Sequence, residues 1–186
     1  MTKTLRADAQ RNRDRLLAAA VALFSEAGQD VSLEAVAKRA GVGIGTLYRH
    51  FPTRDALLEA AYRNEVCQLS EAADALLTAH PPDEALALWL DRFVAYASAK
   101  RGMGTALRAM VACSDLFADA RAMNLAAISR LLAAGAAAGT IRSDVRAEDV
   151  LSAIGAIWAL GDDGWDEQAR RLLGLLMDGL RFGAGA

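Results

Sequence analysis

The positions of the prolines constrain this chain more than any other feature of its sequence. Three prolines occur in 186 residues, all between positions 52 and 82, so residues 83 to 186 lack the main helix breaker. Alanine, the strongest helix former, occurs 42 times. No run of alternating apolar and polar residues is long enough to predict a strand, and no repeat of solenoid period is found. The sequence therefore predicts an all-α protein of about nine helices.

The N-terminal part of the chain predicts three helices. An apolar face from Leu16 to Phe24 indicates the first helix, which Gly28 is expected to end. The other two are short, over residues 33–40 and 44–50.

Small residues mark the ends of these two short helices. Ser32 is the expected N-cap of the first, and Gly41 is its expected stop. Gly43 takes the cap position of the second, and Leu47 is expected to pack inward. Two short helices joined by a glycine turn are typical of the helix-turn-helix, whose second helix enters the DNA major groove.

Six further helices are expected after Pro52 and Thr53. Pro81 and Pro82 separate the first two of them, and Gly102 to Gly104 are expected to form a turn before a short helix that ends near Cys113. The expected ranges are 54–79, 83–100, the short helix, 115–138, 147–160 and 166–182.

The charge is unevenly distributed along the chain. Residues 1–54 hold nine Lys or Arg and five Asp or Glu, a net charge of +4, whereas residues 55–186 hold 12 and 18, a net charge of −6, which sums to −2. We therefore expect a basic, anion-binding domain at residues 1–53 and an acidic helical domain at residues 54–186.

Other classes of protein find little support in the sequence. The apolar runs are shorter than the roughly 18 to 20 residues of a membrane helix, and the basic start has no signal-peptide core, so we expect a cytoplasmic protein without membrane contact. Cys67 and Cys113 are too far apart and too few for a disulfide framework, and we expect both to be buried and inert. With two histidines and no HExxH, CxxC or GxSxG motif, we expect no catalytic site, metal or cofactor, and thus no enzyme.

The third helix carries residues suited to DNA. Four side chains can donate hydrogen bonds to phosphate oxygens through hydroxyl, imidazole or guanidinium groups: Thr46, Tyr48, His50 and Arg54. Ile44 suits contact with a thymine methyl, and Arg49 suits the O6 and N7 atoms of guanine. The alternative interpretation of these residues is a solvated helix surface, with His50 as a core or capping histidine.

The glycines of this region also suggest a nucleotide-binding loop, which their context does not support. Gly41 to Gly45 read GVGIG, but a dinucleotide loop needs GxGxxG between a strand and a helix, and no Walker lysine follows. An interior helical glycine costs about 1 kcal/mol relative to alanine, so Gly45 indicates a position where a side chain would collide with something.

Residues 12 to 60 contain the segments LLAAAVALFSEAG, SLEAVAKRAGV, GTLYRHF and RDALL. Through these segments, residues 12 to 60 resemble the DNA-binding domain of the TetR family of repressors. The resemblance implies an all-helical dimer with a three-helix DNA-binding domain and a larger C-terminal domain that binds an effector and dimerises. It implies phosphate contacts at Ser32, Thr46, Tyr48, His50 and Arg54, and base contacts at Gly43, Ile44, Gly45 and Arg49. Gly43 departs from the Ser or Thr common in the family, so a capping hydroxyl is missing. Further along, GTIRSDV resembles the SbtR-like subgroup.

The C-terminal region is rich in aromatic residues and methionines that form adaptable apolar walls. Among them, Trp89, Phe93 and Met110 are the expected effector-binding residues, with core packing as the alternative. The last two expected helices carry more apolar surface than one small domain should expose, which predicts a homodimer through them, again with intrachain core as the alternative.

Together these features predict a ligand-responsive transcriptional repressor. A dimer would bind a palindromic double-stranded operator and be released by a small, mostly apolar effector. The alternative is a helical-bundle carrier, or an enzyme, that acts on an apolar small molecule without regard to DNA.

Overall fold

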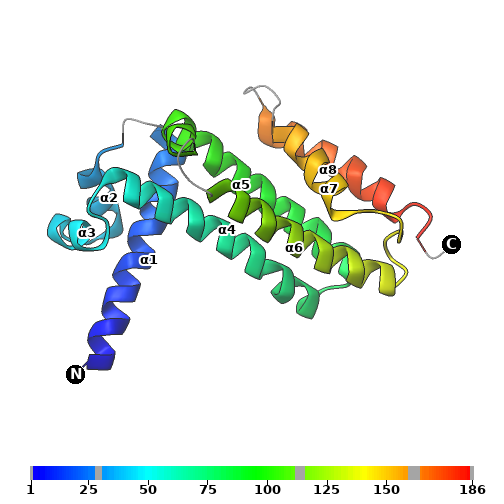
Figure 1. Cartoon of the computed structure of the whole chain (residues 1–186), viewed down its shortest axis with the longest axis horizontal. Coiled ribbons are helices and arrows are strands. Elements are labelled where there is room, and N and C mark those ends of the chain that lie inside the picture. Colours follow the sequence, from blue (N-terminus) through cyan, green and yellow to red (C-terminus); the bar gives the residue numbers. More distant parts are fainter. Residues whose placement is uncertain (1, 28–30, 112–115, 159–163, 185–186) are drawn as a thin grey trace. The chain divides into compact units, whose positions relative to one another are not determined.

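Eight helices make up the described part of the chain in this computed structural model (Figure 1). The structure describes residues 2–27, 31–111, 116–158 and 164–184, and for residues 2–6, 27, 99–111, 116 and 158 it gives the helical course alone. No strand occurs in these ranges, which confirms the all-α prediction. The helices are α1 (Thr2–Ala27), α2 (Leu33–Ala40), α3 (Ile44–His50), α4 (Arg54–Ala79), α5 (Pro82–Val111), α6 (Leu116–Ala137), α7 (Ala147–Trp158) and α8 (Trp165–Arg181).

Most helix ends lie where local chemistry predicts them. The bounds of α2, α3 and α4 agree with the expected ranges. Thr53 caps α4, since its hydroxyl accepts a hydrogen bond from the backbone N–H of Ala56 at 3.1 Å. Gly139 follows α6 in the left-handed conformation with φ of +67°, which glycine adopts without strain. The expected stop at Gly28 and the expected cap at Ser114 lie outside the described residues.

The helix count differs from the prediction in one place. The turn expected at Gly102 to Gly104 is absent from the described backbone, where α5 runs unbroken from Pro82 to Val111 and joins two predicted helices. Two glycines cost helical stability, but each keeps its backbone N–H, so neither breaks the hydrogen-bond ladder as proline does. The good helix formers around them are sufficient to carry the helix through.

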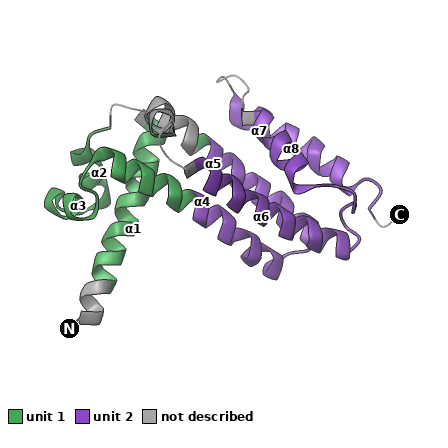
Figure 2. Cartoon of the chain, viewed as in Figure 1, with its two compact units in different colours: residues 1–65, 98–116 green, residues 66–97, 117–186 purple. Residues whose placement is uncertain are grey.

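The chain divides into two compact units (Figure 2). Unit 1 comprises residues 1–65 and 98–116, and unit 2 comprises residues 66–97 and 117–186. The helices α4 and α5 each contribute residues to both units.

The core of unit 1 forms where α1, α2, α3 and the start of α4 meet. Phe24 and Val36 contribute buried side chains from α1 and α2, and Leu47 and Leu58 do so from α3 and α4. Each has an exposed fraction of 1% or less. The aliphatic and aromatic side chains at helical spacing thus hold the short helices against α1, because neither α2 nor α3 is long enough to be stable alone.

A paired cation and anion join α2 to α1 on the surface of unit 1. Arg39 donates two hydrogen bonds to the carboxylate of Glu26, at 2.6 and 2.9 Å. The guanidinium holds the pKa of Glu26 below its usual range, chiefly through the hydrogen bonds. These two parallel bonds link the last turn of α1 to the last turn of α2.

Unit 2 is held by apolar faces of its helices and by one buried indole. Trp89 is fully buried, and its Nε1 donates to the backbone oxygen of Leu69 at 2.8 Å, which ties α5 to α4. At the end of α6, the side chain of Ile141 fills the space beside Gly135. No described helix is both long enough and apolar enough to cross a membrane. The expectation of buried cysteines is wrong for Cys67, which is exposed on α4, because its position falls outside the apolar face of that helix; Cys113 lies outside the described residues.

Candidate nucleic-acid interface

The first helix of the pair, α2, is closed by hydrogen bonds at both ends. The Ser32 hydroxyl accepts a hydrogen bond from the backbone N–H of Ala35 at 3.1 Å, as its expected capping role requires. At the other end, Gly41 has φ of +65°, and its N–H donates to Lys38 O at 3.2 Å, while the N–H of Val42 donates to Ala37 O at 3.0 Å. These two bonds turn the chain sharply into the next helix.

The second helix, α3, has one inward side and one open side. Leu47 is fully buried and anchors the helix in unit 1. On the open side, Ile44 is 38% exposed and Tyr48 is 46% exposed, which is unusual for large apolar and aromatic side chains. These two residues lie four positions apart and so project from the same face of the helix.

The backbone at the start of α3 is uncovered. Gly43 is the N-cap residue, with φ of −69° and ψ of 145°, and supplies no side-chain cap. A Cβ atom built on Gly43 or Gly45 would meet no other heavy atom within 4 Å. The protein itself therefore leaves room for side chains at both positions, and their absence opens the backbone to an external partner.

The remaining predicted contact residues lie around this helix. Arg49 is exposed, and its Nε donates to Gly45 O at 3.1 Å. Thr46 and His50 are half-buried on the same helix, and the His50 and Phe51 ring centroids are 6.1 Å apart. Arg54 is half-buried at the start of α4, with its guanidinium carbon 5.1 Å from the centroid of the Phe24 ring. The structure thus brings the predicted residues to one short helix and the positions that flank it.

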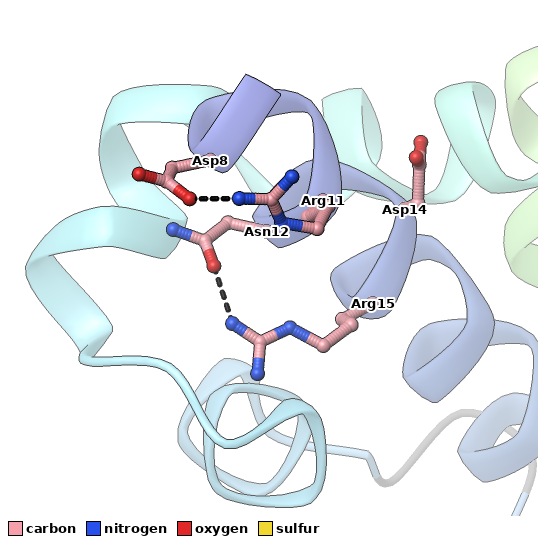
Figure 3. Close-up of a pocket in the computed structure, with 5 residues that line it drawn as sticks. All are labelled: Asp8, Arg11, Asn12, Asp14 and Arg15. Carbon is pink, nitrogen blue, oxygen red and sulfur yellow. Dashed lines mark hydrogen bonds and ion pairs between the residues drawn. The ribbon is translucent and has the colours of Figure 1, made fainter. Parts of the chain in front are cut away.

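A pair of arginines on α1 was missed by reasoning from the sequence. Arg11 and Arg15 project from α1 into a hollow lined also by Asp8, Asn12 and Asp14 (Figure 3). Arg11 bonds to Asp8, and Arg15 bonds to Asn12. The Nη1 atom of Arg15 lies 3.8 Å from the position of a Cβ on Gly41, so this guanidinium adjoins the turn between α2 and α3. The signal was the spacing of four residues between the two arginines, which places both on one helical face.

The residues expected to bind an effector lie in α5. Trp89 and Phe93 are buried, and their ring centroids are 6.0 Å apart. Met110 falls where the structure gives the helical course alone. Among the described residues, no group of three His, Cys, Asp or Glu side chains is arranged to hold a metal ion.

Comparison with known proteins covers both parts of the chain. Residues 16–61 match the family described as bacterial regulatory proteins, tetR family, and residues 81–182 match the C-terminal domain of transcriptional regulators described as SbtR-like. An HTH-type transcriptional regulator of Staphylococcus aureus is 44% identical over 54 residues, so the chain spans 29% of the length of that curated relative and 28% of its own.

Solved structures match over nearly the whole chain. The crystal structure of the TetR transcriptional regulator SCO0520 from Streptomyces coelicolor has a TM-score of 0.85 and 51% identity, covering 94% of this chain and 99% of that one. A TetR transcription regulatory protein from Mycobacterium vanbaalenii has a TM-score of 0.77 and 37% identity, covering 95% and 99%.

Proposed function

Because this chain belongs to the TetR family of transcriptional regulators, we propose that it is a cytoplasmic repressor that binds a palindromic DNA operator as a dimer and releases it when a small, mostly apolar effector binds. The observation that carries the proposal is the open side of α3, where Ile44 and Tyr48 are exposed beside the uncovered backbone of Gly43 and Gly45. Such a surface has no role in the protein's own core and fits a DNA groove.

The contacts on DNA divide by chemistry. Thr46, Tyr48, His50 and Arg54, with Ser32 at the start of α2, would donate to phosphates and fix the register. Ile44 and Arg49 would contact base edges, with Gly43 and Gly45 allowing close approach of the backbone. For Arg49 this requires the side chain to leave Gly45 O, a single exposed hydrogen bond that a guanine pair replaces.

The dimer would form through α7 and α8. On α8, Leu175 is 68% exposed and Phe182, just after it, is 81% exposed, and no atom lies within 4 Å of a Cβ built on Gly179. Leu175→Glu should therefore give a monomer by light scattering. The matched control is Leu88→Glu on α5, where the leucine is 40% exposed. A Leu175→Glu protein that remains dimeric would contradict this interface.

Effector and operator would be coupled through α4. Residues 54–65 of this helix belong to unit 1 and residues 66–79 to unit 2, so one helix is shared by the proposed DNA-binding and effector-binding parts. An effector held among α4, α5 and α6, with Trp89, Phe93 and Met110 as the proposed contacts, would favour a different tilt of α4. Linkage then requires the operator to weaken effector binding by the same factor as the effector weakens operator binding.

The test is selection of duplexes from a random DNA pool by the full-length protein, followed by titration of the enriched duplex over a salt series. A palindrome with steep salt dependence is expected. Arg49→Ala should relax the preference at one position of each half-site, whereas Arg92→Ala, which removes the same charge from an exposed site in unit 2, should leave it unchanged. Failure to enrich any sequence at low salt would favour the apolar-ligand carrier.

A further inference from the structure

One amide lies on the buried face of α6 among apolar side chains. Asn124 is 5% exposed and is the single buried polar residue among those for which the structure describes side chains. Its neighbours along the same face of the helix are Ala120, Ala127, Ile128 and Leu131, all buried. These residues lie three, four or seven positions from Asn124, so all of them share one face of α6, which is buried in unit 2.

The oxygen of this amide has no partner. Among the described residues, Asn124 Oδ1 makes no hydrogen bond, although it is shielded from solvent. Buried acceptors are almost always satisfied, because leaving one without a donor costs free energy that folding does not recover. The described residues thus supply Asn124 Oδ1 with no donor, which leaves the place open for a donor from a bound molecule.

Two donor side chains of unit 2 are already engaged within the unit. The indole N–H of Trp89 is bound to Leu69 O at 2.8 Å. The guanidinium of Arg130, further along α6, contacts Asp74 at 2.9 Å and Ser70 O at 3.3 Å. These bonds join α5 and α6 to α4 within unit 2, where Figure 2 shows the three helices side by side.

Small side chains on either side of Asn124 distinguish this part of the face. Ala120 and Ala127 precede and follow it, whereas the face continues with Ile128 and Leu131 toward the end of α6. A bound water needs two to four polar partners, and alanine, isoleucine and leucine side chains supply none. An organic group with one donor and an apolar body matches this setting better than water does.

We propose that Asn124 is the polar anchor of the effector site, with its Oδ1 accepting a hydrogen bond from a hydroxyl or N–H group on an otherwise apolar effector. This inference rests on the proposed function and narrows the chemistry of the effector. The apolar body would contact the aromatic series on α5, where the Trp89 and Phe93 centroids are 6.0 Å apart and those of Phe93 and Tyr96 are 5.6 Å apart.

The test uses two probes that differ in one donor, 4-hexylphenol and 4-hexylanisole. Binding to the full-length protein without DNA is followed by tryptophan fluorescence. The phenol should bind about tenfold more tightly than the anisole, as one additional hydrogen bond implies. In Asn124→Leu, which keeps the branched shape without the polar atoms, the two probes should bind equally and Tm should not fall. The control is Ser129→Leu, on the exposed side of the same helix, which should keep the preference for the phenol.

Several results would overturn the inference. Equal binding of the two probes, tighter binding of the anisole, or no binding of either shows that no donor is recognised. A preference that survives in Asn124→Leu places the recognised donor elsewhere. A Tm lowered by several degrees shows that the amide has a structural partner; if the leucine variant does not fold, Asn124→Ala is compared with the wild type in the same way.

The outcome is separable from that of the proposed function. Selection of duplex DNA needs no probe, so a protein that enriches a palindrome but does not distinguish the phenol refutes only the role of Asn124. A protein that enriches no sequence refutes the repressor, whichever probe it binds.

Discussion

Replacing Gly45 by alanine should separate the stability of α3 from its contact with DNA. Gly45 is the second residue of this helix, and a Cβ there would meet no heavy atom within 4 Å. The methyl group therefore introduces no clash in the free protein. Glycine inside a helix costs about 1 kcal/mol relative to alanine, and somewhat less in the first turn, so the variant should gain about 0.5 to 1 kcal/mol. For a chain of this size that corresponds to a rise in Tm of about 1 to 4 °C.

The effect on DNA should have the opposite sign. If the backbone at Gly45 approaches DNA closely, the methyl group overpacks the contact, at a cost of about 1 to 3 kcal/mol. Operator affinity, measured by fluorescence anisotropy on the selected duplex, should then fall about tenfold or more. Thr78→Ala, at an exposed position near the end of α4, is the control, because alanine is a better helix former than threonine. It should gain similar stability, keep its elution volume and bind DNA as the wild type does.

Two results would refute this reasoning. A Gly45→Ala protein with unchanged operator affinity would show that the backbone does not approach DNA here. A lowered Tm would show that the glycine is required by the protein's own fold.

Three further predictions concern stability, each measured by urea or thermal unfolding followed by circular dichroism. Gly135→Ala should lose about 1 to 3 kcal/mol, because the new Cβ would lie 2.5 Å from Cδ1 of Ile141; an unchanged midpoint would contradict that packing. Burial raises the pKa of Glu65, so its contribution to stability is complete below the ordinary glutamate pKa and is lost as pH rises through the raised value. Glu65→Gln should accordingly raise Tm at pH 7 and not at pH 4, and the same gain at both values would exclude ionisation as the cause. The pKa of Glu26 is lowered by Arg39, so its contribution is present above the ordinary glutamate pKa and disappears as pH falls through the lowered value. Glu26→Gln should therefore lose less stability than the wild type as the pH is lowered. If stability falls with pH equally in both proteins, the Glu26–Arg39 pair does not cause the loss.

The helix ends that sequence predicts best are those governed by local chemistry. Ser32 and Gly41 limit α2 through bonds made within a few residues, so the sequence contains all the necessary information. The turn expected at Gly102 failed because glycine without a positive φ or a following proline only weakens a helix. The N-terminal extension of α1 back to Thr2 carries few apolar residues, so periodicity alone indicated this helix only from Leu16 onward.

The sequence predicted some parts of the candidate site and missed others. The open side of α3 follows from its short sequence, because Leu47 must pack inward and the positions around it then face outward. The spacing of Arg11 and Arg15 places both on one face of α1, whereas the approach of Arg15 to the turn at Gly41 comes only from the tertiary fold. The sequence could not decide whether Trp89 packs in the core or lines an effector site, because both roles need an apolar aromatic side chain. The hydrogen bond from its Nε1 to Leu69 O depends on tertiary structure and could not be predicted.

The contrast between the first turns of α2 and α3 has a consequence for motion. A serine hydroxyl closes the start of α2, whereas glycine leaves the start of α3 without a side-chain acceptor. Helix ends without caps open more often, and glycine adds backbone entropy to the open form. Amide hydrogens in the first turn of α3 should therefore exchange with deuterium faster than those of α2. If α3 contacts DNA as proposed, the DNA would order this uncapped first turn, and part of each binding event would be a local folding event.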